Sequence, residues 1–320
     1  MKDSKRKLIS FVVPVYNEED NVNQLYQAVT DVMMPLAAKY DYEFVFTDNH
    51  STDSTFTKLN ELAQKDRRIR IIRFSRNFGY QLSIFTGYTR ANGDAAIQLD
   101  GDLQDPPELI PEFLKQWENG HQVVYGVRNC REEGWLIRNL RKAFYRFINM
   151  LSEDHLPPDA GDFRLVDHKI LTVIKKLDDY QPYLRGSIAA MGFSQVGIPY
   201  NRPDRQRGES KFTSKEMVSL AVDGILNHSI VPLRFATYIG LSVSGLTMLL
   251  SAGYMVAKQV APIPWVSGFA TTTVLILLSL STLSLLLGVI GEYLGRIYRQ
   301  VKRQPIIIVE TTVNDADESC

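Results

Sequence analysis

The chain has 320 residues, 45% of them apolar, which is enough for one large domain with its own core and a smaller additional part. Its 36 basic residues balance its 36 acidic residues, so no overall charge favours nucleic acid as a partner. Two cysteines, Cys130 and Cys320, exclude a disulfide-rich fold and fit a reducing compartment.

Strand-like and helix-like segments alternate from residue 8 to about residue 191. The β-rich runs ISFVV, YEFVFTD, IRIIRFS and AAIQLD are separated by segments with helical patterns. The first run ends at Pro14 without a cleavage pattern, so we interpret it as a buried strand and not as a signal peptide. The alternation predicts an α/β, Rossmann-like domain with a mostly parallel sheet and helices on both faces. Ligands bind such sheets at the carboxyl ends of the strands, where PVYNEED, TDNHSTDS, SRNFGYQ and LDGDLQDPPE follow.

Two long uncharged segments come later, at residues 235–257 and 266–291. Each is long enough to cross a hydrocarbon core of about 30 Å as a helix, and buried core helices are the alternative. Arg234 precedes the pair and four basic residues follow it, against Lys258 between the segments. By the positive-inside rule, both ends and the domain before them face the cytoplasm. Residues 214–230 have one apolar helical face, which suits either an interfacial helix on the membrane or a helix packed on the domain.

The expected organisation therefore has five parts. They are a cytoplasmic catalytic domain (1–212), a juxtamembrane amphipathic helix (213–232), two transmembrane helices (233–258 and 265–292) and a cytoplasmic C-terminal tail (293–320). Within that tail, the last ten residues, TTVNDADESC, are expected to be a disordered acidic end. Small residues at Gly240, Ser244 and Gly245 on the first span allow helices of different subunits to pack together.

The clearest chemical motif is Asp100-Gly-Asp102-Leu-Gln104, directly after the strand AAIQL. Two carboxylates one residue apart can share a hard divalent cation that also binds phosphate oxygens. An isolated pair of this kind is often only a solvated loop, and the sequence DPPE at 105–108 also resembles a helix start. The position at a strand end favours the metal site.

Arginines form a second group in the later half of the predicted domain. Forked guanidinium groups suit phosphate and pyrophosphate, and Arg128, Arg138 and Arg164 are the candidates for that role. We interpret Arg141 and Arg146 as a solvated helix face.

The motifs PVYNEEDN, SRNFGYQ, DGDLQDPPELIPEF, GDFRL and RGESK occur in the order seen in one family. Over nearly the whole chain, the sequence closely resembles the polyisoprenyl-phosphate glycosyltransferases of GT-A fold. These include dolichol-phosphate mannose synthases and the GtrB-type bactoprenol (undecaprenyl-phosphate) glucosyltransferases, which also have two C-terminal membrane helices. The resemblance implies a nucleotide-sugar donor, Mg²⁺ or Mn²⁺, a polyprenyl phosphate acceptor, a bacterial inner membrane location and a homo-oligomer.

The resemblance also implies roles for individual residues. The metal ligands would be Asp100, Asp102 and Gln104. The nucleotide-sugar site would contain Pro14, Tyr16, Asn17, Glu18, Asp48, Asp100, Gly101 and Ser210. The catalytic set would be Asp162, Arg128, Arg138, Arg164 and Lys211, with Arg128 and Arg138 on the acceptor phosphate and Lys211 in a loop that closes over the diphosphate.

One motif departs from the family pattern. An acidic pair followed by Gly-Ser is usual after the second strand, whereas this chain has Asp48-Asn49-His50-Ser51. The departure leaves the nucleotide base open. We interpret His50 as a loop side chain at a position usually held by glycine and not as a catalytic base.

The implied reaction is a single displacement with inversion. A lipid phosphate monoester has its second pKa near 6, so it is largely dianionic at neutral pH and needs little help from a general base. Alignment and neutralisation of the departing diphosphate would then supply most of the catalysis. Asp162 would either accept a proton or orient an arginine, and both roles are open.

Glucose from UDP-glucose is the favoured donor, with GDP-mannose and UDP-amino-arabinose as alternatives. A processive polysaccharide synthase is disfavoured because the chain has no Arg-Trp pair, and a Rossmann oxidoreductase because it has no G-x-G-x-x-G. A non-catalytic membrane scaffold is disfavoured by the intact acidic motif.

Overall fold

The computed structural model describes residues 6–128, 160–177, 182, 184–201, short helical pieces between 238 and 256, residues 268–301 and residues 307–315. The chain divides into two compact units. The first contains Met1–Arg146, Asp154–Thr213 and Pro305–Cys320, and the second contains Phe147–Glu153 and Ser214–Gln304.

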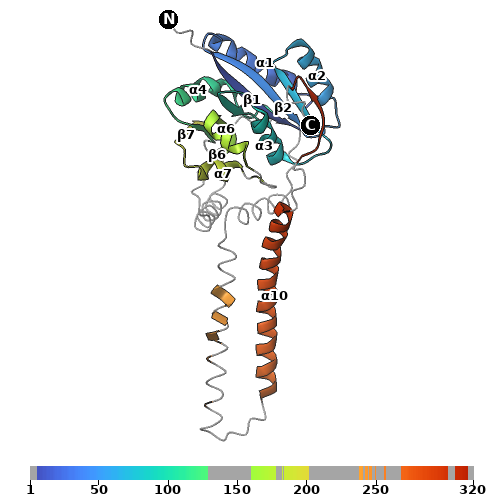
Figure 1. The fold of residues 1–320 in the computed structure, drawn as a ribbon, viewed down its shortest axis with the longest axis vertical. Coiled ribbons are helices and arrows are strands. Elements are labelled where there is room, and N and C mark those ends of the chain that lie inside the picture. Colours follow the sequence, from blue (N-terminus) through green and yellow to red (C-terminus); the bar gives the residue numbers. More distant parts are fainter. Residues whose placement is uncertain are drawn as a thin grey trace. The chain divides into compact units, whose positions relative to one another are not determined.

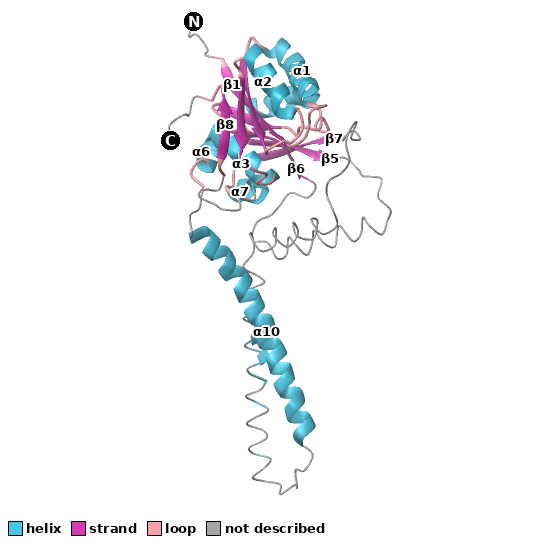
Figure 2. Cartoon of the chain, turned by 90° about the vertical axis from the view of Figure 1, so that its right-hand side faces the viewer, coloured by secondary structure: helices cyan, strands magenta, loops and turns pink. Residues whose placement is uncertain are grey.

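The first unit is built on a sheet that, among the described residues, has eight strands in the order β7-β5-β6-β4-β1-β2-β3-β8 (Figures 1 and 2). Parallel pairing joins β4, β1, β2 and β3, and also β5 and β7. Antiparallel pairing joins β6 to both β4 and β5, and β8 to β3. The predicted mostly parallel sheet is confirmed. The strands are β1 (Lys7–Val15), β2 (Tyr40–Asp48), β3 (Ile69–Phe74), β4 (Ala95–Gln98), β5 (Val123–Arg128), β6 (Ala160–Asp167), β7 (Gln195–Tyr200) and β8 (Val309–Val313).

Helices cover both faces of this sheet, as the alternating pattern predicted. Successive strand residues point to opposite faces, so Phe11 and Val13 of β1 enter one core while Val12 enters the other. Gly87 lets α3 lie close to β1, because a Cβ at this position would overlap the Val12 side chain. On the first face lie α1 (Val22–Met33), α2 (Thr55–Lys65) and α4 (Ile110–Glu118), and on the second lie α3 (Tyr80–Arg90), α6 (His168–Ile174) and α7 (Leu184–Ala190). Short 3₁₀ helices, η1 (Met34–Leu36) and η2 (Pro107–Leu109), precede β2 and α4.

The C-terminal segment corrects one expectation. Residues 311–320 were expected to be a disordered acidic end, but residues 309–313 form β8, which pairs with β3 at the edge of the sheet. Figure 2 labels β8. The physical reason is twofold. The edge of β3 offers unpaired backbone groups to a β-branched segment, VETTV, and the acidic Asp315 pairs with the buried Arg70 and the partly exposed Arg90. The correction covers residues 311–315, which are the part of that end that the structure describes.

The second unit contributes one long described helix, α10 (Gly268–Val301), of 34 residues. Large apolar side chains on it are exposed, among them Ile276, Leu280 and Leu287. Judged on the described residues, no helix has the combination of length and apolar character needed to cross a membrane. The predicted amphipathic helix at 213–232 lies outside the described residues, as does most of the predicted span at 233–258.

Candidate active site

The loops that follow β1 and β2 are joined to each other by hydrogen bonds. The Asn17 N–H donates to the Ser51 hydroxyl at 3.0 Å, and the Asn17 side-chain oxygen accepts from the Thr52 N–H at 2.8 Å. The Glu18 N–H donates to the Thr55 hydroxyl, at the start of α2, at 2.8 Å. Asn17 has a φ of 55°, a left-handed conformation that asparagine tolerates better than most residues. The PVYNE segment is therefore held against the β2 loop.

Asp48 ends β2 and is fully buried. Its carboxylate accepts hydrogen bonds from the Ser51 N–H at 3.0 Å and from Nη1 of Arg73 at 3.1 Å. A buried carboxylate needs such partners, because desolvation disfavours its charged form. Two residues later, His50 has a φ of 62°, in the region that glycine adopts most readily, which agrees with its interpretation as a loop residue.

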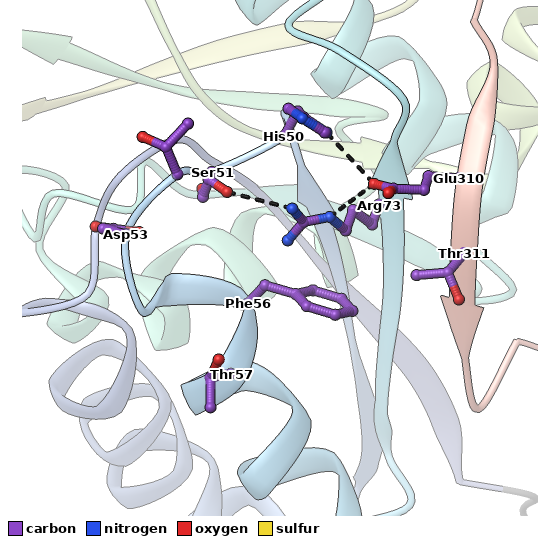
Figure 3. Close-up of a pocket in the computed structure, with 9 residues that line it drawn as sticks. His50, Ser51, Asp53, Phe56, Thr57, Arg73, Glu310 and Thr311 are labelled. Atoms are coloured by element: carbon purple, nitrogen blue, oxygen red, sulfur yellow. Dashed lines mark hydrogen bonds and ion pairs between the residues drawn. The ribbon is translucent and has the colours of Figure 1, made fainter.

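A hollow of about 630 Å³ lies beside the β2 loop (Figure 3). Arg73 crosses it, with its guanidinium 4.4 Å from the centre of the Phe56 ring. Its walls carry charges of both signs and come from residues 50–53, the first turn of α2, Arg73 of β3, and Glu310 and Thr311 of β8. The C-terminal strand β8 therefore lines the same hollow as the loop after β2, which is predicted to bind the nucleotide.

The acidic segment after β4 packs against the end of β1. A Cβ at Gly101 would lie 3.2 Å from a methyl group of Val15 and 3.3 Å from the Pro14 carbonyl oxygen, so glycine allows this close approach. The Asp100 N–H donates to the Asp105 carboxylate at 3.2 Å, which shapes the turn. The predicted metal ligands and the predicted nucleotide residues thus meet at the carboxyl ends of neighbouring strands, as expected for this kind of sheet.

The Asp100 carboxylate is held by two side chains. The Tyr80 hydroxyl donates a short hydrogen bond to its Oδ1, and the Gln98 amide donates to the same oxygen at 2.9 Å. Desolvation, with the neighbouring carboxylates of Asp100, Asp162 and Asp105, raises the pKa of Tyr80 well above its ordinary value, so the hydroxyl stays a donor at neutral pH. These contacts orient Asp100 through residues of α3 and β4.

The three predicted metal ligands offer the oxygen atoms that hard divalent cations prefer. Asp100, Asp102 and Gln104 are all partly exposed, and the Gln104 N–H donates to the Asp102 carboxylate at 3.1 Å. In the described ranges, no group of three or more His, Cys, Asp or Glu side chains is arranged to hold a metal ion by itself. Two carboxylates and one amide leave coordination positions for phosphate oxygens and water, so this donor set fits Mg²⁺ or Mn²⁺ bound together with a substrate.

Asp162 of β6 forms a two-pronged ion pair with an arginine of α7. Nε and Nη2 of Arg185 donate to its two carboxylate oxygens at 2.7 and 2.6 Å. This geometry gives strong and directional binding. Nearby on β6, Arg164 is 5% exposed and donates to the Gly161 carbonyl oxygen at 2.8 Å. The sequence left two roles open for Asp162, accepting a proton or orienting an arginine. The ion pair with Arg185 is the contact that the second role requires.

Several predicted residues cannot be placed. Arg138, Ser210 and Lys211 lie outside the described residues. Arg128 ends β5, but its side chain is not among those described. The acceptor phosphate site and the closing loop therefore remain predictions.

Five side chains around the site were given no role from the sequence. Tyr80 belongs to the motif SRNFGYQ after a strand, and a tyrosine in a strand-end segment is a signal for a hydrogen-bond donor at this edge of the sheet. Gln98 lies two residues before Asp100, and its alternating position in the strand gives no sign that its amide reaches that carboxylate. The other three give no local signal, because their partners are distant in sequence: Arg73, Arg185 and Glu310.

Comparison with known proteins shows what this chain is similar to. Residues 10–174 match the family Glycosyl transferase family 2. The SfII prophage-derived bactoprenol glucosyl transferase of Shigella flexneri is 36% identical over 303 residues, covering 94% of this chain and 97% of that protein. An uncharacterized glycosyltransferase of Bacillus subtilis is 39% identical over 302 residues, covering 94% of this chain and 93% of that protein. Among solved structures, glucosyl-3-phosphoglycerate synthase of Mycobacterium tuberculosis with uridine diphosphate is 18% identical with a TM-score of 0.45, covering 69% of this chain and 78% of that one.

Proposed function

Because the chain belongs to glycosyl transferase family 2, we propose that it transfers one glucose from UDP-glucose to the phosphate of undecaprenyl phosphate, with inversion at the anomeric carbon. The observation that carries this proposal is the similarity to a bactoprenol glucosyl transferase over 94% of the chain, well beyond residue 174 where the family match ends. The chain is a glycosyltransferase with an α/β, GT-A domain. The donor and the acceptor are the proposed part.

The donor would bind at the edge formed by the β1, β2 and β4 loops. Support comes from the hydrogen bonds that join the β1 and β2 loops, from the close approach of Gly101 to the end of β1, and from the Asp100 carboxylate held there. A cation held by Asp100, Asp102 and Gln104 would supply positive charge to the departing diphosphate. The remaining residues proposed to contact the nucleotide-sugar are Pro14, Tyr16, Asn17, Glu18, Asp48, Gly101 and Ser210.

The acceptor phosphate would be aligned by arginines. We assign this role to Arg128 and Arg138, with Arg164 beside them and Lys211 on the leaving diphosphate. Because the lipid phosphate is already dianionic at neutral pH, Asp162 is not needed as a base. Its proposed role is to hold Arg185 at the edge of the acceptor site, for which the two-pronged contact is the support.

A lipid acceptor requires that the enzyme work at a membrane. We propose that residues 233–258 and 265–292 span the bacterial inner membrane, that residues 213–232 lie at its surface, and that the catalytic unit faces the cytoplasm. The support is the uncharged stretches within them, residues 235–257 and 266–291, and the basic residues that flank these stretches. A homo-oligomer assembled through the small residues of the first span completes the proposal.

The test is sugar transfer by the purified full-length protein in detergent. Radiolabelled UDP- and GDP-sugars are each supplied with undecaprenyl phosphate, with Mg²⁺ or Mn²⁺ and separately with EDTA. Asp102→Asn is compared with Asp31→Asn, the same change at an exposed aspartate on α1 that pairs with Gln27. Labelled lipid from UDP-glucose alone, lost with EDTA and with Asp102→Asn but retained with Asp31→Asn, is the expected result.

Other outcomes discriminate between the alternatives. Lipid labelled from GDP-mannose or a UDP-amino-arabinose would keep the reaction class and replace the donor. A folded protein that binds nucleotide but labels no lipid with any donor would refute the polyprenyl phosphate acceptor and favour a scaffold role.

A further inference from the structure

We propose that Glu310, on the strand that follows α10 along the chain, is a positioning residue for the donor nucleotide and acts through Arg73 on the loop that contains Asp48. The inference rests on the proposed nucleotide-sugar site and extends it to a segment that the catalytic family match, ending at residue 174, does not include. Four features of the structure carry it.

The first feature is that β8 is held firmly in its register. Asp315, just beyond the strand, has a nearly fully buried carboxylate that pairs with Arg70 and, at 3.3 Å, with Arg90. Before it, the Asn314 amide donates to the carbonyl oxygens of Ala63 and Ile69 at 3.1 and 3.0 Å. These buried polar contacts would be left unsatisfied if the strand slipped by one residue.

The second feature is a β-bulge at Glu310. Thr311 pairs with Arg73 and Val309 pairs with Phe74, so Glu310 is the extra residue between two successive pairs. A bulge re-aims the side chain of its extra residue, and bulges are common next to functional sites. Here the side chain of Glu310 points across β3 into the hollow beside the β2 loop (Figure 3).

The third feature is the pair of contacts that Glu310 makes there. Its carboxylate accepts a hydrogen bond from Nε of Arg73 at 2.8 Å and lies 3.3 Å from Nδ1 of His50. The hydrogen bond from Arg73 is the main cause that lowers the pKa of Glu310, so the pair is charged at neutral pH. Glu310 thereby fixes which way the guanidinium of Arg73 faces.

The fourth feature is what the rest of that guanidinium does. Nη1 of Arg73 donates to the buried Asp48 carboxylate at 3.1 Å, and Nη2 donates to the Ser51 carbonyl oxygen at 3.3 Å. Ser51 in turn bonds Asn17 of the β1 loop. The guanidinium uses three different nitrogen atoms on three partners, a rigid spread that the single nitrogen of a lysine does not offer. Glu310, Arg73 and the two nucleotide loops form one continuous hydrogen-bonded chain.

The contribution of Glu310 should be modest because its side chain is 46% exposed. Solvent screens an ion pair of this exposure, so its removal should change an equilibrium constant by only about two- to fivefold. We therefore expect Glu310→Gln to raise the Kd for nucleotide, and the KM for donor, about two- to fivefold while kcat is retained.

The experiment titrates UDP and GDP into the full-length protein in detergent by calorimetry, without acceptor. Glu310→Gln is compared with Glu112→Gln, a matched change in a partly exposed glutamate that pairs with Lys115 on α4. Arg73→Met and the double variant complete a mutant cycle, because Glu310→Gln should have no further effect once Arg73 is absent. Salt at about 1 M, where the Debye length is about 3 Å, should reduce the difference between the wild type and Glu310→Gln.

Equal nucleotide affinity in the wild type and Glu310→Gln, or additive effects with Arg73→Met, would overturn the inference even if the variant is less stable. Equal losses of nucleotide affinity in Glu310→Gln and Glu112→Gln would also overturn the inference. The titration needs no acceptor, so it tests this inference separately from the proposed reaction. If the wild type forms the lipid product but Glu310→Gln binds nucleotide as the wild type does, only this inference is refuted. If Glu310→Gln and Arg73→Met lose nucleotide affinity in a coupled way but no lipid product forms, the proposed acceptor is refuted and this inference is retained.

Discussion

Replacing Tyr80 by phenylalanine tests whether the carboxylate of Asp100 is orientated before a cation binds. The substitution removes one hydroxyl and leaves the ring in place. Asp100 would lose the short hydrogen bond from Tyr80 and keep the bond from the Gln98 amide at 2.9 Å. The change therefore affects the orientation of Asp100 more than its charge.

The magnitude follows from the contacts. A hydrogen bond to a charged group contributes about 1.5–3 kcal/mol when one partner is removed. Tyr80 is 37% exposed and the Gln98 amide still holds the same oxygen, so the lower end of that range applies. A loss of about 1.5 kcal/mol corresponds to roughly tenfold weaker binding of the cation.

The assay is titration of Mn²⁺ into the full-length protein in the presence of UDP, followed by the paramagnetic signal of the free ion. Tyr26→Phe is the matched control, because the Tyr26 hydroxyl donates to Asp66 at 3.0 Å and neither residue belongs to the predicted metal site. We expect Tyr80→Phe to weaken Mn²⁺ binding and Tyr26→Phe to leave it unchanged. Equal Mn²⁺ affinity in the wild type and Tyr80→Phe would refute the reasoning, whatever the effect on stability.

Three further predictions concern other parts of the catalytic unit. Arg185→Met should lower kcat about 10- to 100-fold with UDP affinity retained, because it removes the guanidinium that Asp162 holds at the edge of the proposed acceptor site; steady-state kinetics and a UDP titration check this. Gly87→Ala should destabilise the unit by about 1–3 kcal/mol in urea unfolding, since the added methyl overlaps a side chain of β1. The hydrogen bond from the Tyr40 hydroxyl at 2.6 Å lowers the pKa of Glu118 in the folded protein. The charged Glu118 therefore stabilises the folded state above the unfolded pKa of about 4.3, and this stabilisation is lost as pH falls through the lower pKa of the folded state. Urea midpoints of the wild type and Glu118→Gln should therefore differ at pH 7 and converge toward pH 3, and a constant difference would contradict this assignment.

The sequence by itself determined the class of fold and the edge of the sheet at which chemistry is expected. Local periodicity is enough for this, because a buried parallel strand must be apolar and the residues after it must turn. Asp48 and Asp100 were placed at strand ends by this reasoning, and the structure has them there. The motif order was enough to indicate the family.

The tertiary structure alone decided which side chains orient these residues. Tyr80 meets Asp100 across 20 positions, Arg73 meets Asp48 across 25, and Glu310 meets Arg73 across 237. No periodicity or spacing encodes such contacts, because they depend on which strands become neighbours.

The C-terminal segment illustrates the same limit. The composition of residues 311–320, with three acidic residues among the last six, is typical of a disordered end. The free edge of β3 and the buried guanidinium of Arg70 give that segment a partner, and neither can be seen until the sheet is assembled. Local sequence fixes what a segment prefers when alone, whereas burial and pairing with distant segments decide what it does in the folded chain.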